Sequence, residues 1–182
     1  MNIFLLDKEP DKCAEYHCDK HVVKMCLELA QILSTVHRYV DGREIVIIKN
    51  NKKITKYVLD DSRDFLLYQA THINHPSVIW TRQSKENYNL VKNIFISLCS
   101  EYTYRYNKIH LSYTKLIDIL KHSPSKISDK KFVQMTKEFQ AMPIQYKNDD
   151  PVQAYRDYYN GEKQNIFSWK NRNKPFWLSK KD

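Results

Sequence analysis

A run of polar residues in the first third of the chain could carry out chemistry from one face of a helix. His21, Lys24, Glu28 and Gln31 follow one another at spacings of three, four and three residues, which places all four on one side of an α-helix. Glu28 has apolar neighbours, so we expect its carboxylate near an apolar surface that suits a general acid. The alternative is a solvated helix face with local ion pairs.

A second group has the spacing of a metal site on a helix. Its members are Cys13, His17, Cys18 and His21. Side chains four residues apart on a helix can hold one metal ion, and zinc would need a further ligand such as His72 or His75. Because such pairs are common by chance, we expect neither a resident metal nor another cofactor. A metal-dependent nuclease that uses His17, His21 and His75 stays an alternative.

A loop that carries two histidines precedes a predicted helix beginning at Pro76. His72, Asn74 and His75 could present hydrogen-bond donors to a phosphate at the amino end of that helix, and Arg82 follows it. The alternative is a loop whose polar groups satisfy its own backbone.

Aromatic and cationic residues are interleaved in two further segments, residues 101–110 and 169–177. Such a mixture suits stacking on bases and contact with phosphates, although tyrosines at helical spacing also pack a core. Together with the candidates above, the residues that we expect to contact nucleic acid are Lys24, Gln31, His72, His75, Arg82, Arg105, Lys108, His110, Arg172, Lys174 and Trp177.

The composition agrees with an anionic partner. The 182 residues carry a formal net charge of +9, which favours nucleic acid, although a basic surface without that role would give the same charge. Only two glycines occur, which excludes a glycine-rich phosphate loop. The sequence shows neither a signal peptide nor a stretch that could span a membrane. We therefore expect a cytoplasmic protein, in the host cell if it is viral, that acts on DNA or RNA and not at a membrane.

Hydrophobic periodicity predicts a mainly α-helical fold. Helices are expected over residues 11–40, in up to two segments, and over 63–68, 76–82, 85–106, 112–121 and 151–159. Pro10 suits the start of the first helix, Ser84 is the expected cap of the long one, and Gly42 and Gly161 are the expected helix ends. Apolar residues around a polar turn predict a β-hairpin over about 43–59. The expected fold is a compact single-domain helical bundle with one small β-hairpin.

Six short motifs span most of the chain. Two of them are Cys-Asp-Lys-His-Val-Val-Lys-Met over residues 18–25 and Thr-His-Ile-Asn-His-Pro over residues 71–76. Together the six motifs resemble a family of small phage- and virus-encoded proteins, a resemblance that implies no particular activity.

Residues 21–40 also align without gaps on the first long helix of another family. His21 meets a histidine there, Glu28 falls on the catalytic glutamate, and the aromatic tail ending at Trp177 is similar to that family's carboxyl terminus. The segment resembles phage-type endonuclease V, a pyrimidine dimer DNA glycosylase with AP-lyase activity. The resemblance implies a base-excision enzyme that acts on DNA through the Met1 amine, Glu28 and His21.

The chain departs from that family close to the implied chemistry. The family's nucleophile is the α-amine of a threonine exposed by removal of methionine, whereas Asn2 is too large for efficient removal, so the amine here would be that of Met1. Leu27 and Gln31 stand where the family has arginines. An α-amine, with an ordinary pKa of about 7.7–8.0, can still attack C1′ of a flipped nucleotide. The alternative from another class is a non-enzymatic viral effector that binds a host protein or nucleotide.

Overall fold

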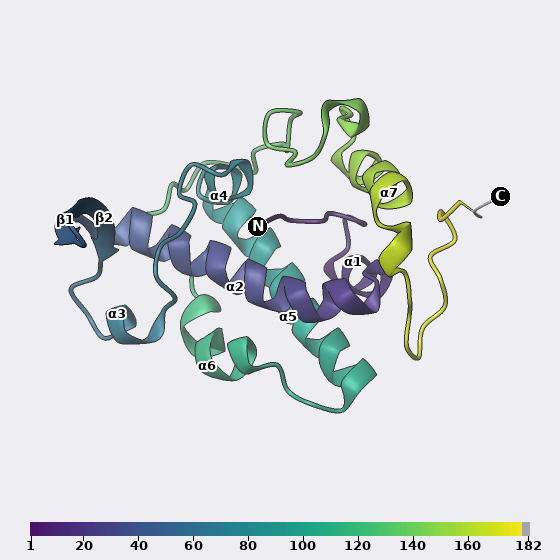
Figure 1. Cartoon of the computed structure of the whole chain (residues 1–182), viewed down its shortest axis with the longest axis horizontal. Helices are drawn as coiled ribbons and strands as arrows, with labels where there is room; N and C mark the ends of the chain where they lie inside the picture. Colours follow the sequence, from purple (N-terminus) through teal and green to yellow (C-terminus); the bar gives the residue numbers. More distant parts are fainter. Residues whose placement is uncertain (180–182) are drawn as a thin grey trace.

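Seven α-helices and one β-hairpin make up the part of the chain that the structure describes, residues 1–179 of a computed structural model (Figure 1). The helices are α1 (Pro10–Tyr16), α2 (Asp19–Asp41), α3 (Arg63–Leu66), α4 (Pro76–Thr81), α5 (Lys85–Tyr106), α6 (Leu111–Leu120) and α7 (Pro151–Glu162). The antiparallel strands are β1 (Arg43–Lys49) and β2 (Lys52–Val58), and short 3-10 turns cover Ile144–Tyr146 and Gln164–Ile166. The predicted mainly α-helical fold with one small hairpin is confirmed.

The core forms where α2 crosses α5, with α4 and α6 against α2 and α1 against α5 (Figure 1). The three- and four-residue spacing of Val22, Cys26, Leu29, Leu33 and Val36 predicts that they form a buried face of α2, and all five are buried. From α5 the facing residues are Val91, Ile94, Phe95 and Leu98. Burial of these apolar side chains on two long helices is the main stabilising contribution, and it fixes the direction of the polar face of α2.

Local signals in the sequence set most of the element boundaries. Pro10 is the first residue of α1, and the Gly42 N–H bonds to the Arg38 carbonyl at 3.1 Å where α2 ends. The Ser84 hydroxyl accepts a hydrogen bond from the Asn87 N–H at 3.1 Å and caps α5. The predicted helix end at Gly161 is wrong, because α7 continues through it to Glu162.

The amino-terminal segment, Met1–Leu6, is extended and lies beside the middle of α2 (Figure 1). The side chains from Ile3 to Leu6 are buried, so this segment is an integral part of the core. Among residues 1–179, no helix is long and apolar enough to cross a membrane.

Candidate active site

The amino terminus and Glu28 come together on the polar face of α2. The Glu28 Oε2 lies 3.7 Å from the Met1 amino nitrogen and accepts a hydrogen bond from the Asn2 N–H at 3.0 Å. Lys24, one turn earlier on α2, places its Nζ 3.0 Å from Oε1. The surroundings of this carboxylate are therefore also ionic, because each of its oxygens has a cation beside it, and its expected role as a general acid stays a prediction.

Asn2 fixes the position of the amino terminus. Its Nδ2 donates to the Ala141 carbonyl at 2.9 Å, and its Oδ1 accepts from the Tyr155 hydroxyl at 2.9 Å and from the Ile3 N–H at 2.8 Å. Tyr155 is fully buried on α7. These contacts within the chain hold the Met1 amine in place.

The amine belongs to the part of Met1 that reaches solvent. The Met1 side chain is 4% exposed and packs against the core, whereas the residue as a whole is half-buried, so the remaining exposure comes from its main chain. The Glu28 side chain is 12% exposed. An α-amine beside a carboxylate can attack an electrophilic carbon while the carboxylate exchanges protons.

The loop with two histidines lies beside this pair. His75 caps α4, because its Nδ1 accepts a hydrogen bond from the Ser77 N–H at 3.2 Å. Burial lowers the pKa of His75, the charges of the amino terminus and of His72 lower it further, and the Glu28 carboxylate opposes this shift. His75 is therefore neutral at neutral pH and shares the electrostatic surroundings of the amine. The phosphate contacts expected of this loop stay a prediction.

Arg82 supports the same loop through a hydrogen bond to its backbone. Its Nη1 donates to the Ile73 carbonyl at 2.6 Å, and its guanidinium lies 3.9 Å from the centroid of the Tyr39 ring. Gln31 is half-buried one turn after Glu28 on the same face of α2. Gln31 is thus beside the candidate site, whereas Arg82 supports the neighbouring loop, and the expected contacts of both with nucleic acid stay predictions.

His21 is a structural residue in this fold. This corrects the expectation that it takes a direct part in catalysis. The residue is 5% exposed, its Nδ1 lies 2.6 Å from the Tyr159 hydroxyl, and its ring packs 4.6 Å from that of Phe4. Burial lowers the pKa of His21 to about 3, with further lowering by His17 and Lys24, so the ring is neutral. Within residues 1–179, no hydrogen bond joins it to Met1 or Glu28. Its contact with Phe4 supports the amino-terminal segment.

The alternative metal site is not assembled. The spacing of four residues serves a metal site only within one helix, but α1 ends at Tyr16 and α2 begins at Asp19, so Cys13 and His21 stand on different helices. His17 Nδ1 lies 2.7 Å from the Cys13 carbonyl oxygen. In the described part of the chain, no three His, Cys, Asp or Glu side chains gather closely enough to hold a metal ion.

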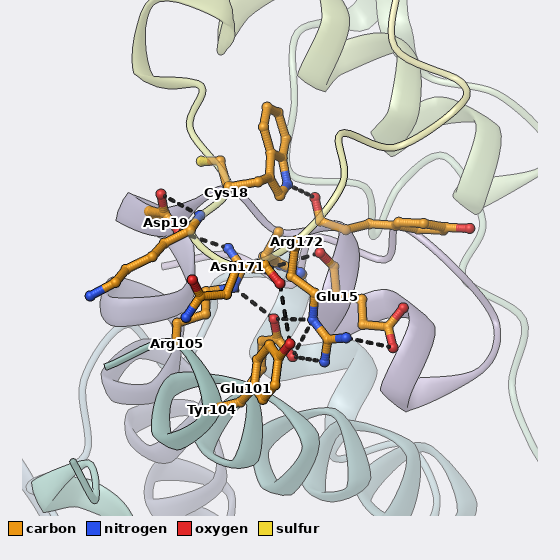
Figure 2. Close-up of polar contacts among 12 residues, drawn as sticks. Glu15, Cys18, Asp19, Glu101, Tyr104, Arg105, Asn171 and Arg172 are labelled. Atoms are coloured by element: carbon orange, nitrogen blue, oxygen red, sulfur yellow. Dashed lines mark hydrogen bonds and ion pairs between the residues drawn. The ribbon is translucent and has the colours of Figure 1, made fainter. Parts of the chain in front are cut away.

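Arg105 and Arg172 belong to an ionic cluster, which we define as Glu15, Asp19, Glu101, Arg105 and Arg172 (Figure 2). Arg105 is 1% exposed and donates to Glu101 Oε1 at 2.6 Å, to Asp19 Oδ1 at 2.9 Å and to the Glu15 carbonyl at 2.9 Å. The predicted nucleic-acid contact of Arg105 is wrong, because its guanidinium is buried and engaged by the protein.

Arg172 joins the carboxyl-terminal tail to this cluster. Its Nε and Nη2 donate to Glu101 at 2.9 and 2.8 Å, and its guanidinium stacks 4.1 Å from the centroid of the Tyr104 ring (Figure 2). The Arg172 side chain is 29% exposed, and its main role is to bind Glu101 within the fold. The cluster therefore ties the tail to α5 and to the junction of α1 and α2.

The remaining basic and aromatic candidates differ in solvent exposure and in their contacts within the protein. Lys108 and Lys174 are exposed, so the structure leaves their predicted role open to test. His110 caps α6 by accepting from the Ser112 N–H at 3.1 Å. Trp177 is half-buried and packs edge-on against Tyr159, which makes part of the tail a structural element.

Asn2 and Tyr155 were missing from the predicted site. Asn2 was considered only as an obstacle to removal of methionine, and Tyr155 only as part of one of the six motifs, that over residues 150–159. The two residues are 153 positions apart in the chain, and no periodicity in the sequence connects them.

Comparison with known proteins identifies the family. A family model described as pyrimidine dimer DNA glycosylase matches residues 1–114. The chain belongs to the pyrimidine dimer DNA glycosylase family. The predicted resemblance to phage-type endonuclease V is thereby confirmed, and the match contains Met1, Glu28 and the loop with His72 and His75. No curated protein and no solved structure matches the chain. Tyr155 lies beyond the residues that the family model matches, although its hydroxyl donates the hydrogen bond that positions Asn2.

Proposed function

We propose that this protein is a DNA glycosylase with AP-lyase activity that uses its α-amine as nucleophile and Glu28 as acid–base group. The observation that carries the proposal is the 3.7 Å separation between the Met1 nitrogen and Glu28 Oε2. The family supplies the substrate class, damaged duplex DNA. A nucleotide flipped out of the duplex would bring its C1′ to the open side of the amine.

The reaction can be written with the groups at this site. The unprotonated amine forms a bond with C1′, the glycosidic C1′–N bond breaks, and the base leaves with the bonding electrons and takes up a proton. The amine passes its own proton to Glu28, which gives it to O4′ as the sugar ring opens and leaves a Schiff base between the amine and C1′. The Glu28 carboxylate then takes a C2′ proton, the C3′–O bond breaks, and the 3′-phosphate leaves with the bonding electrons. Water finally adds to C1′ and releases the amine. Lys24 and the Asn2 N–H keep the carboxylate beside the amine throughout.

Borohydride trapping tests the proposal. Three duplexes of one sequence would be compared, one with a thymine dimer, one with an abasic site and one undamaged. We expect a covalent adduct with at least one damaged duplex and none with the undamaged one, and acetylation of the α-amine should abolish it. An adduct on a lysine side chain, or no adduct with either damaged duplex, would contradict the proposed nucleophile.

Peptide mass mapping of the adduct identifies the reacting nitrogen. With Met1 retained, the amine is the nitrogen 3.7 Å from Glu28 Oε2. If Met1 is removed in the cell, the nitrogen of Asn2, which lies 3.0 Å from the same oxygen, becomes the amine. Either form places an α-amine against Glu28, so the mass of the amino-terminal peptide separates the two forms without changing the mechanism.

A further inference from the structure

The β-hairpin projects beyond the carboxyl end of α2 (Figure 1). Its strands pair from Arg43 with Val58 to Lys49 with Lys52. The turn residues Asn50 and Asn51 have φ angles of 52° and 58°, the left-handed conformation that a tight two-residue hairpin turn requires. A two-stranded hairpin is marginal by itself in water, so this one depends on how its base is held.

The base of the hairpin is fixed to α2. Arg38, which is fully buried, donates through Nη1 to the Tyr57 carbonyl at 3.0 Å and through Nε to the Tyr68 carbonyl at 2.7 Å. At Gly42 the backbone passes so close to β2 that an added Cβ would lie 2.6 Å from the Val58 carbonyl oxygen. The hairpin is thus an arm with a rigid base and an uncovered tip.

The surface of this arm combines exposed apolar side chains with free cations. Val46, Ile48 and Ile54 are 59%, 75% and 37% exposed. The hairpin carries five cationic side chains and one carboxylate, a net charge of +4. Its exposed lysines are Lys49, Lys52, Lys53 and Lys56, and within residues 1–179 no ion pair engages any of them. Unpaired cations beside apolar groups fit an anionic partner that also offers apolar groups, as duplex DNA does with its phosphates and with the thymine methyl groups in its major groove.

The arm and the candidate active site share one face of α2. Tyr39 follows Glu28 by eleven residues, which is three helical turns plus about 20°, so the two side chains are aligned about 16 Å apart along the helix. The Tyr39 ring packs 5.4 Å from that of Tyr57 in β2, and the Arg82 guanidinium lies 3.9 Å from the centroid of the same Tyr39 ring. A distance of about 16 Å corresponds to about five base pairs of B-DNA.

We propose that the hairpin binds the major groove of duplex DNA, beginning about five base pairs to one side of the nucleotide at the active site. The major groove of B-DNA admits a two-stranded ribbon as it stands, whereas the minor groove, about 6 Å wide, has to be widened to take one. The lysines contact phosphates, and Val46 and Ile48 face base edges, including thymine methyl groups. This inference rests on the proposed function for the position of the reacting nucleotide, and binding of the arm to duplex DNA can be measured without any reaction.

A salt titration tests the arm. The probe is a duplex with one tetrahydrofuran analogue of an abasic site, which the proposed lyase cannot cleave, and the readout is fluorescence anisotropy. K52Q/K53Q should reduce the slope of log affinity against log salt by about 2 and should weaken binding at least tenfold at low salt. The matched control K130Q/K131Q removes another adjacent pair of exposed lysines and should leave the slope unchanged. Equal losses in the two variants, or no loss in K52Q/K53Q, would overturn the proposal.

Duplex length gives a second readout. Two probes would end about four base pairs from the analogue, one on its 5′ side and the other on its 3′ side, before the expected position of the arm. The difference between wild type and K52Q/K53Q should disappear on one of these probes and persist on the other. Ile48→Ser should weaken binding to the long duplex without changing the salt slope. If the wild-type protein is a dimer that Ile48→Ser dissociates, the arm holds a second copy and the proposal is wrong.

The two proposals fail in different ways. Wild-type protein that binds the analogue duplex through Lys52 and Lys53 but forms no borohydride adduct would contradict the proposed function alone. An adduct together with equal behaviour of K52Q/K53Q and K130Q/K131Q would contradict the arm alone.

Discussion

Replacing Glu101 by glutamine should destabilise the fold by about 3 kcal/mol. Glu101 is 4% exposed, and its carboxylate accepts hydrogen bonds from Arg105 at 2.6 Å and from Arg172 at 2.8 and 2.9 Å (Figure 2). Glutamine preserves the shape of the side chain, but it removes the charge and turns one acceptor into a donor. That donor would point at a guanidinium.

The size of this loss of stability depends on the partners that Arg105 and Arg172 keep when Glu101 is replaced. Removing one partner of a buried ion pair costs about 3–5 kcal/mol, because the other charge stays buried. Arg105 would keep its hydrogen bonds to Asp19 Oδ1 and to the Glu15 carbonyl, both at 2.9 Å. The contribution of the Arg172–Glu101 ion pair is reduced by solvent screening, because the Arg172 side chain is 29% exposed. The lower end of the range is therefore expected. For a chain of this length, it corresponds to a fall in Tm of about 6–12 °C.

Thermal and urea unfolding followed by circular dichroism measures this loss. Glu9→Gln is the matched control, since Glu9 is exposed and its side chain has no hydrogen bond or ion pair within residues 1–179. The control should change the free energy of unfolding by less than about 0.5 kcal/mol. A loss below about 1 kcal/mol in Glu101→Gln would refute the reasoning, because it would mean that the guanidinium groups do not depend on this carboxylate.

The pH dependence of the same pair of proteins gives an independent check. Burial raises the pKa of Glu101, but the hydrogen bonds from Arg172 and Arg105 outweigh burial and hold it below its ordinary value. A carboxylate with a lowered pKa in the fold stabilises the protein above its unfolded pKa of about 4.3, and this stabilisation is lost as the pH falls through the folded pKa. The stability gap between wild type and Glu101→Gln should therefore stay constant above about pH 5 and shrink below about pH 4.

Glu28→Gln should slow base release by about 10²–10⁴-fold while leaving the affinity for the analogue duplex nearly unchanged, and full single-turnover activity would rule out Glu28 as the acid–base group. Tyr155→Phe should cost about 1 kcal/mol in urea unfolding and slow adduct formation, since it removes a hydrogen bond that fixes Asn2; unaltered trapping would show that this anchor does not position the amine. Lowering the pH from 7 to 5 should reduce stability, because buried neutral histidines take up protons on unfolding. These are His17, His21 and His37, whose pKa values burial lowers to about 4, about 3 and about 4. Below about pH 6.5 the unfolded chain binds more protons than the fold, so each of them contributes a loss of up to about 1.4 kcal/mol per pH unit. A constant urea midpoint over this range would contradict their burial.

Most features that depend on neighbours in the sequence were predicted correctly, with the helix end at Gly161 as an exception. Apolar spacing identified the buried face of α2, Ser84 and Gly42 marked helix ends, and the polar turn marked the hairpin. Lys24 and Glu28, four residues apart on a helix, form the ion pair that their spacing allows, at 3.0 Å. In each case the interacting groups are a few residues apart, and backbone geometry alone brings them together.

Features that depend on what covers a helix were decided by the tertiary structure. The amine reaches Glu28 because Ile3–Leu6 are buried beside α2 and Asn2 bonds to Ala141 and Tyr155, and these partners are remote in the sequence. Arg105 was expected at the surface, but folding brings Asp19, 86 residues away, against it. Periodicity tells which side chains share a face, whereas packing of distant segments determines whether that face meets solvent, a carboxylate or the core. The sequence by itself therefore determined the elements and the side of α2 on which the chemistry lies, and only the fold decided which of the polar residues remain free to act.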